Sequence, residues 1–472
     1  MTVFNQIAKN TVINLAGKII SLVFGLISIA IMARYLGQEG FGYYTTVIAF
    51  LSFFGILVDF GLSLTTVQMI SKTGADVNKI MNAIMSLRII TAVIFLAIAP
   101  AVVWFFPYNI FIKIGVLITV FSFFCVTLIQ TLNGLFQQKL KMMPMTVAEV
   151  IGRIVLVAVI ALAAFTHQSI YWIFSAITIS NFVNLMIVLY YSKKHFTWRW
   201  QIDFTLWKEI MQRTWPIALS ITFNLIYLKM DTIILSLTRS QTEVGLYGAT
   251  YRVIDILTML PAVFMGIMLP AMTKLYIENN KTELFSLMRK AFDALMIFAM
   301  PIVLGTMIIG RSVMVFIAGS DFAASGNILK VLILASGAIF VASLYCYAVV
   351  AVNKQRQMMW AYLTTAILTM IGYIYFIPRY GYWGAGWMTV FSEVFITTWA
   401  IVLVYRTTKF APSFKTFLKT IPAALAMVVV LYFVQELPVL ILILIACVVY
   451  FGILYLLKAI SKEGVMELLK IK

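Results

Sequence analysis

The chain has 472 residues, of which 63% are hydrophobic and 11% are charged, and its mean hydropathy is +1.01. A soluble globule needs more polar surface than this composition supplies, so the sequence indicates an integral membrane protein. The formal net charge of +18 is typical of a membrane protein whose basic loops lie on one side of the bilayer, where they attract anionic lipid headgroups. This interpretation is favoured over nucleic-acid binding.

In chain order, the apolar runs predict fourteen transmembrane helices, each close to the ~20 residues that cross a bilayer. They lie near residues 11–33, 42–65, 81–105, 112–133, 145–165, 170–192, 212–237, 246–270, 290–318, 328–350, 357–377, 384–405, 416–434 and 438–457. The runs are continuously apolar, which favours helices over a β-barrel. The first run is longer than the core of a cleavable signal peptide, so we expect it to be retained.

Lysine and arginine collect on alternate sides of these spans. The N-terminus, the even-numbered connections and the C-terminal tail together hold 24 basic residues, whereas the odd-numbered connections hold five. Because cytoplasmic loops carry the positive excess, both termini are predicted to lie in the cytoplasm.

The six remaining basic residues fall inside predicted spans: Lys18, Arg88, Arg153, Lys229, Arg252 and Arg311. A charge at that depth costs about 2.5–3.5 kcal/mol even on lenient insertion scales, so each needs a partner, a route to the interface or a water-filled cavity. Lys18, Arg88 and Arg153 each lie seven or eight residues from a cytoplasmic helix start, about 11 Å deep. We therefore expect these three to ring an inner vestibule, while Arg311 reaches the interface.

Some of these cations have acidic neighbours that permit a purely structural role. Glu149 precedes Arg153 by four residues, the spacing of a helical ion pair. Lys229 and Arg252 flank one extracytoplasmic turn and are expected to face each other, with Asp231 and Asp255 available to neutralise them. Asp231, Asp255 and Glu393, the last in the middle of its span, are also candidates for ion coupling.

Cysteine and histidine give no sign of a metal or cofactor. Three cysteines without paired spacing all fall in apolar runs, and the two histidines, His167 and His195, lie near different segment ends. Neither a zinc site nor a disulfide framework is predicted. We expect no cofactor.

The chain repeats itself. Residues 39–46, "EGFGYYTT", and residues 243–250, "EVGLYGAT", each open a span, and an offset of 204 residues brings the first six spans onto the next six. Two copies with an even number of spans have the same orientation, an arrangement that encloses a central cavity between two lobes. We therefore predict an all-α membrane protein with an N-lobe at 1–200, a C-lobe at 201–410 and two further helices within 411–472.

Two segments carry a resemblance to a known family. "ARYLGQEGFGYYTTVIAFLSFFGILVDFGLS" (Ala33–Ser63) resembles the start of the polysaccharide transporter, or O-antigen flippase, family of the multidrug/oligosaccharidyl-lipid/polysaccharide exporter superfamily. "YLKMDTIILSLTRSQTEVGLYGATYRV" (Tyr227–Val253) is similar to the matching hairpin of the same family. The likeness extends from the first span through the twelfth, and the final pair of spans is also usual in the family.

The resemblance implies a flippase that moves an undecaprenyl-pyrophosphate-linked oligosaccharide from the inner to the outer leaflet of a bacterial plasma membrane by alternating access. Family members use cavity cations on the first, second, seventh and eighth spans, which carries over to Lys18, Lys229 and Arg252. The second span has no cation here. Elementary electrostatics agrees, because a fixed cation stabilises a diphosphate in a low-dielectric medium.

Other functions and partners stay open at this stage. A cation-coupled multidrug exporter of the same superfamily is the alternative function, although the first span lacks the carboxylates it would need. No motif of a membrane enzyme is found. The residues do not identify the glycan or its pathway, which could be O-antigen, capsule, teichuronic acid or another exopolysaccharide, and they do not identify the coupling ion. Contacts with the polymerase and glycosyltransferases of that pathway also stay open. The oligomeric state is open as well, since a monomer is sufficient for a two-lobed transporter.

Overall fold

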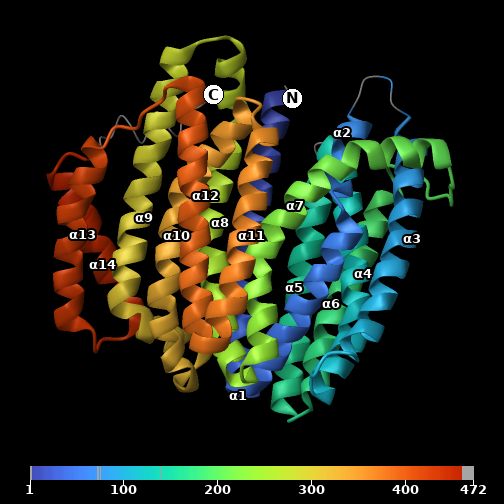
Figure 1. Cartoon of the computed structure of the whole chain (residues 1–472), viewed down its shortest axis with the longest axis horizontal. Helices are drawn as coiled ribbons and strands as arrows, with labels where there is room; N and C mark the ends of the chain where they lie inside the picture. Colours follow the sequence, from blue (N-terminus) through green and yellow to red (C-terminus); the bar gives the residue numbers. More distant parts are fainter. Residues whose placement is uncertain (1–2, 72–73, 75, 140, 460–472) are drawn as a thin grey trace. The chain divides into compact units, whose positions relative to one another are not determined.

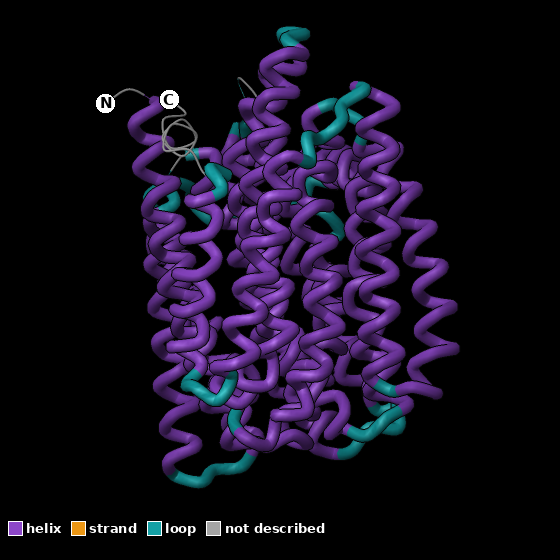
Figure 2. The backbone as a smooth tube through the Cα atoms, turned by 90° about the vertical axis from the view of Figure 1, so that its left-hand side faces the viewer, coloured by secondary structure: helices purple, strands orange, loops and turns teal. Residues whose placement is uncertain are grey.

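A computed structural model describes residues 3–71, 74, 76–139 and 141–459 of the chain. Over these residues it forms α-helices joined by short loops, and no strand is present (Figure 2). The helices are α1 (Val3–Asp59), α2 (Leu62–Ile70), α3 (Val77–Val103), α4 (Ile110–Gln138), α5 (Met143–Phe165), α6 (Ile170–Ser192), α7 (Phe204–Thr238), α8 (Gln241–Ile277), α9 (Lys281–Ala318), α10 (Ser325–Ala351), α11 (Gln355–Tyr380), α12 (Tyr382–Thr408), α13 (Lys415–Val434) and α14 (Val439–Leu456), with a 3₁₀ turn, η1 (Ser320–Ala324), before α10.

The first two predicted spans both lie in α1, which consists of two helical segments that meet at a kink. As one straight helix its 57 residues would extend about 86 Å, nearly three times the ~30 Å hydrocarbon core of a bilayer. Gly37 divides it, with φ 65° and ψ −173°, a conformation that only glycine adopts without strain. In Figure 1, α1 accordingly runs from the N end to the edge carrying its label and back towards α2.

The predicted number of spans is confirmed in the described part of the chain. Thirteen helical stretches are long and apolar enough to cross a membrane, and the first of them, Gly17–Ile70, contains two of the fourteen predicted spans. Several helices run beyond the predicted ends. α7, for example, begins at Phe204 and not near residue 212, because Asp203 caps it by accepting a hydrogen bond from the Leu206 N–H at 2.9 Å.

The chain divides into two compact units, residues 1–248 and residues 249–472. The first contains α1–α7 and the start of α8. Thr214 of α7 donates its hydroxyl to Thr65 of α2 at 3.1 Å, and Tyr108 shares a 2.7 Å hydrogen bond with Ser236 of α7. The lobe boundaries at 200 and 410 that the repeat suggests stay a prediction.

Glycines allow the helices of the first unit to pack closely. A Cβ atom on Gly17 of α1 would lie 1.8 Å from Thr146 Cγ2 of α5, and one on Gly152 of α5 would lie 3.3 Å from the Ser180 carbonyl oxygen of α6. Small residues allow such close crossings in membrane proteins. They fix the distances between α1, α5 and α6.

The two copies of the repeated motif contact each other reciprocally. A Cβ on Gly42 would lie 1.8 Å from the Gln241 carbonyl oxygen, and one on Gly245 would lie 1.9 Å from the Gln38 carbonyl oxygen. The contacts make Gly42 equivalent to Gly245 and Gln38 equivalent to Gln241, and each of these pairs is 203 positions apart, one fewer than the 204 read from the sequence motif. The helices are therefore paired by a local two-fold arrangement in which neither glycine has room for a side chain.

In the second unit, α10 is the most enclosed helix: 61% of its most apolar stretch is buried, compared with 22% for α14. α13 and α14 pack on α9 through a cluster that includes Met427, Leu431 and Tyr450. The Tyr450 hydroxyl donates to the Ile297 carbonyl oxygen at 2.8 Å, which ties α14 to α9. The two helices outside the repeat thus have their own attachment to the unit.

Candidate substrate-binding cavity

A polar cavity of about 590 Å³ lies inside the first unit, between α1, α4, α5 and α6. Its volume falls within the ~300–1,000 Å³ of typical ligand sites. Each helix presents one face to it. On α5, for example, Thr146, Glu149 and Arg153 follow one another at helical spacings of three and four residues.

Two of the predicted cations line this cavity together. Lys18 comes from α1 and Arg153 from α5. The contact of Gly17 with Thr146 presses α1 against α5 at the residue before Lys18. For Lys18 and Arg153, both of which lie in the described part of the chain, no ion pair or hydrogen bond of the side chain is formed.

Glu149 shares the cavity wall with these cations. The helical ion pair that its spacing from Arg153 would permit is not formed: none of the ion pairs among the described residues joins them. The cavity therefore presents two positive charges and one negative charge from side chains that do not neutralise each other by direct contact.

Five carboxamide side chains complete the polar wall, and sequence reasoning missed them. Three come from α4 and two from α6: Gln130, Asn133, Gln137, Asn181 and Asn184. The α4 residues lie at positions i, i+3 and i+7, so they share one helical face. This periodicity of amides within an apolar span was the available signal.

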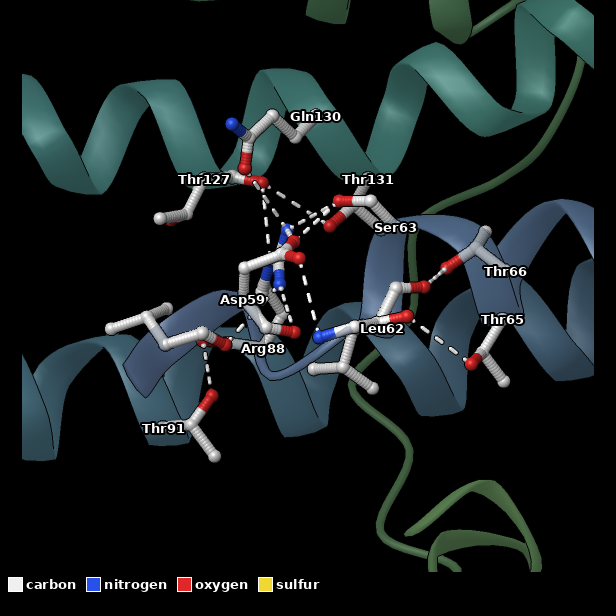
Figure 3. A network of polar contacts seen from close by, with 12 residues as sticks. Asp59, Leu62, Ser63, Thr65, Thr66, Arg88, Thr91, Thr127, Gln130 and Thr131 are labelled. Carbon is white, nitrogen blue, oxygen red and sulfur yellow. Dashed lines mark hydrogen bonds and ion pairs between the residues drawn. The ribbon is translucent and has the colours of Figure 1, made fainter. Parts of the chain in front are cut away.

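Arg88, expected on the same vestibule, does not line the cavity. Its side chain is 0% exposed and extends from α3 to the break between α1 and α2, where Phe60 and Gly61 have φ of 40° and 77° (Figure 3). Its Nη2 atom lies 2.6 Å from Asp59 Oδ1. The predicted ring of three cations is therefore wrong for Arg88, because a carboxylate distant in sequence holds it inside the protein.

All three guanidinium nitrogens of Arg88 are engaged. Nε donates to the Thr127 carbonyl oxygen at 3.2 Å, and Nη1 donates to the carbonyl oxygens of Val58 at 3.2 Å and Asp59 at 3.1 Å. Asp59 in turn accepts hydrogen bonds from the Gly61 N–H and the Ser63 hydroxyl. Arg88 thus satisfies carbonyls that the end of α1 leaves without helical partners.

One residue joins this network to the cavity. Nη2 of Arg88 donates to Gln130 Oε1 at 3.4 Å, and Gln130 is also part of the cavity wall. Figure 3 shows the amide nitrogen of Gln130 turned away from Arg88. Among the described hydrogen-bond partners of Arg88, Gln130 is the one that also lines the cavity.

The remaining predicted residues of the first unit lie elsewhere on α7. Lys229 borders a small apolar cavity of about 20 Å³ together with Phe53 and Leu57 of α1. Asp231 is 0% exposed, and its Oδ2 atom accepts a hydrogen bond from the Tyr247 hydroxyl at 2.7 Å. Neither residue lines the larger cavity.

Three predicted residues belong to the second unit. Arg252 and Asp255 on α8 form an ion pair of 3.8 Å at i,i+3 spacing, with 31% and 46% of their side chains exposed. Glu393 on α12 is 5% exposed. The expectation that Lys229 and Arg252 face each other stays a prediction.

The sequence profile of the family described as "Polysaccharide biosynthesis protein" matches residues 7–276, more than half of the chain. The chain belongs to this family. Within the polysaccharide biosynthesis family, a similar protein is stage V sporulation protein B of Bacillus subtilis (strain 168), 24% identical over 162 residues. That match covers 32% of this chain and 31% of the relative.

Solved structures confirm the predicted transporter fold for this family member. The lipid II flippase MurJ, in an inward closed conformation, has a TM-score of 0.78 at 18% identity, covering 94% of this chain and 98% of MurJ. An inward-facing multidrug resistance MATE family transporter of the MOP superfamily has a TM-score of 0.68 at 12% identity, covering 84% and 98% of the two chains. The resemblance noted from the sequence is confirmed, and these relatives are named as transporters or flippases and not as enzymes.

Proposed function

We propose that the protein is a flippase that moves an undecaprenyl-pyrophosphate-linked oligosaccharide from the inner to the outer leaflet by alternating access. The observation that carries the proposal is the presence of Lys18 and Arg153, without ion-pair partners, on the wall of one cavity of about 590 Å³. Each charge costs about 2.5–3.5 kcal/mol within a membrane. An anionic ligand that binds both would offset that cost.

The chemistry of the two cations suits a diphosphate. A guanidinium binds phosphate oxygens through two parallel hydrogen bonds, whereas an ammonium is a mobile point charge. At 4 Å and an effective dielectric constant of 20, each charge–charge contact amounts to about 4 kcal/mol. Glu149 on the same wall opposes this attraction in part, so the net charge of the three groups is +1.

The proposal includes a location and an orientation. We place the chain in the bacterial plasma membrane with both termini in the cytoplasm, because 24 basic residues belong to the predicted cytoplasmic side. Lys18 and Arg153 then lie about 11 Å inside the inner leaflet, where the lipid-linked glycan is made. In the second half of the transport path, Lys229 and Arg252 are proposed as further contacts of the diphosphate.

A cation-coupled multidrug exporter is the second candidate function. Glu393, 5% exposed in the interior of α12, and Asp231, 0% exposed, are the observations that favour it. Buried carboxyl groups within membrane helices are typical of ion coupling. In the flippase proposal these two residues, with Asp255, would couple an ion to glycan export.

The test is glycan export in cells that lack the gene and are complemented with variants. We expect Lys18→Met and Arg153→Met to reduce surface glycan at least tenfold and to leave lipid-linked oligosaccharide in the inner leaflet, because each loses one diphosphate contact. Lys18→Arg is expected to export. Membrane levels are compared by immunoblot.

Lys113→Met is the matched control, since it removes one cation from the same unit at a position where Lys113 lies over the Trp104 ring and not on the cavity. Normal export by both cavity variants would contradict the proposal. Loss of drug resistance in those variants with normal glycan export would favour the exporter.

A further inference from the structure

We infer that the carboxamide face of the cavity, formed by Gln130, Asn133 and Gln137 of α4 and Asn181 and Asn184 of α6, binds the hydroxyl groups of the sugar next to the diphosphate. This inference rests on the proposed flippase function. It assigns the two parts of one headgroup to two parts of one cavity, the anion to Lys18 and Arg153 and the first sugar to the amides.

The amides are costly where they stand unless water or a polar ligand in the cavity meets them. α4 and α6 are otherwise apolar spans, and an amide moved out of water without a hydrogen bond costs about 1–3 kcal/mol. Five amides on two facing stripes exceed what helix packing needs, because Gly115 and Gly152 already bring α6 close to α4 and α5.

Two amide oxygens on this face are inaccessible to solvent and have no protein partner: Asn133 Oδ1 and Asn184 Oδ1. Two other amides are oriented by neighbours. Asn181 Nδ2 donates to Ser122 Oγ at 2.7 Å, and Gln130 Oε1 accepts from Arg88 (Figure 3). The face therefore holds amides with fixed orientations beside two acceptors that no protein donor satisfies.

A sugar is the ligand class that this pattern fits. Each hydroxyl group both donates and accepts, and an amide does the same through its NH₂ and carbonyl groups. A lipophilic drug would leave the two unpartnered acceptors unsatisfied, and a diphosphate that carries a sugar has no hydrogen to donate to them at neutral pH. Glu149 adds a carboxylate acceptor on the same wall.

The test compares two lipids that carry the same two diphosphate charges and differ in the sugar. Purified protein in nanodiscs is titrated with the sugar-free methyl ester of undecaprenyl diphosphate and with undecaprenyl diphosphate carrying one N-acetylglucosamine. We expect the wild type to bind the glycosylated lipid about fivefold more tightly or better, because each added hydrogen bond contributes about 0.5–1.5 kcal/mol. Asn133→Leu/Asn184→Leu should remove that preference and leave the affinity for the sugar-free lipid unchanged.

Two further variants guard against a loss of folding. Gln137 is exposed on the cavity wall, so Gln137→Met should reduce the preference in a fully folded protein. Asn327→Leu, on α10 and not part of the cavity, should retain it. Lys18→Met should weaken binding of both lipids equally.

The outcomes separate the two proposals. If the wild type binds neither lipid, the proposed flippase function fails. If it binds both lipids equally, or if Asn133→Leu/Asn184→Leu and Gln137→Met keep the preference for the glycosylated lipid, the flippase proposal stands and the assignment of the carboxamide face to the sugar is overturned.

Discussion

Replacing Arg88 by methionine tests whether this buried cation is structural. The change removes every hydrogen bond of the guanidinium, including those to three backbone carbonyls, and leaves the Asp59 carboxylate without its cation. Removing one partner of a buried pair costs about 3–5 kcal/mol. The Asp59 side chain is 20% exposed, so we expect the lower end, about 3 kcal/mol.

For a unit of 248 residues, about 3 kcal/mol corresponds to a fall in Tm of roughly 6–12 °C. Thermal unfolding in detergent, followed by the fluorescence of the ten tryptophans at one scan rate, measures this shift. Arg88→Lys should also destabilise, because one ammonium cannot reach the carbonyls of α1 and of α4 together. The double variant Arg88→Met/Asp59→Asn should recover part of the loss, since no uncompensated carboxylate remains.

The opposite result is equally clear. If Arg88→Met leaves Tm within about 1 °C of the wild type and abolishes glycan export, Arg88 contacts the substrate and the structural interpretation is refuted. Equal Tm losses in the single and double variants would show that the Asp59 charge is not what makes the single change costly.

Three further predictions concern packing, pH and topology. Gly42→Ala should destabilise by about 1–3 kcal/mol, because its Cβ would lie 1.8 Å from the Gln241 carbonyl oxygen, whereas Gly25→Ala, with nothing within 4 Å, should not lower Tm; equal Tm values would refute the close contact. Burial, followed by the charges of Lys141, Lys139 and Lys194, lowers the pKa of His195 below its usual 6.5. As the pH falls, the unfolded chain therefore binds this proton before the folded one, and the stability present above pH 6.5 is lost. Between pH 7.5 and 5.5 the Tm of the wild type should fall more than that of His195→Gln, and parallel curves of Tm against pH would contradict this. In a background without the three native cysteines, a membrane-impermeant maleimide should label Lys113→Cys but not Lys281→Cys in intact cells. The reverse labelling would show that the predicted orientation in the membrane is wrong.

Much of the fold follows from the sequence because membrane helices are specified by length and hydropathy alone. The apolar runs on either side of residues 34–41 predicted two spans joined by a loop. The structure shows that a single glycine, Gly37, turns the chain there. Helix ends were harder to predict, since α7 starts at a cap, Asp203, well outside its apolar run. The motif aligns Glu39 with Glu243, an offset of 204 residues, whereas backbone contact relates Gly42 to Gly245, an offset of 203; the alignment of the two six-span halves stays a prediction.

The candidate site was predictable only in part. Lys18 and Arg153 were found from their charge and depth, and the structure brings them to one cavity. Arg88 has the same charge and depth, but its partner Asp59 is 29 residues away, a pairing that depends on how α1 ends and not on helical spacing. The amides escaped notice because neutral polar residues carry no penalty large enough to mark them individually, and their meaning depends on which helix faces they share.

Gln130 has a thermodynamic consequence that neither the cavity nor the Arg88 network has alone. Its single amide belongs to both, with Oε1 bonded to Arg88 and the side chain on the cavity wall. Coupling free energies are reciprocal, so a ligand that moves this amide must change the stability of the α1–α2 break by the same amount that the break changes the ligand's affinity. Gln130→Met should therefore abolish any dependence of ligand affinity on Arg88, and a double-mutant cycle that finds the coupling intact would show that it travels by another route.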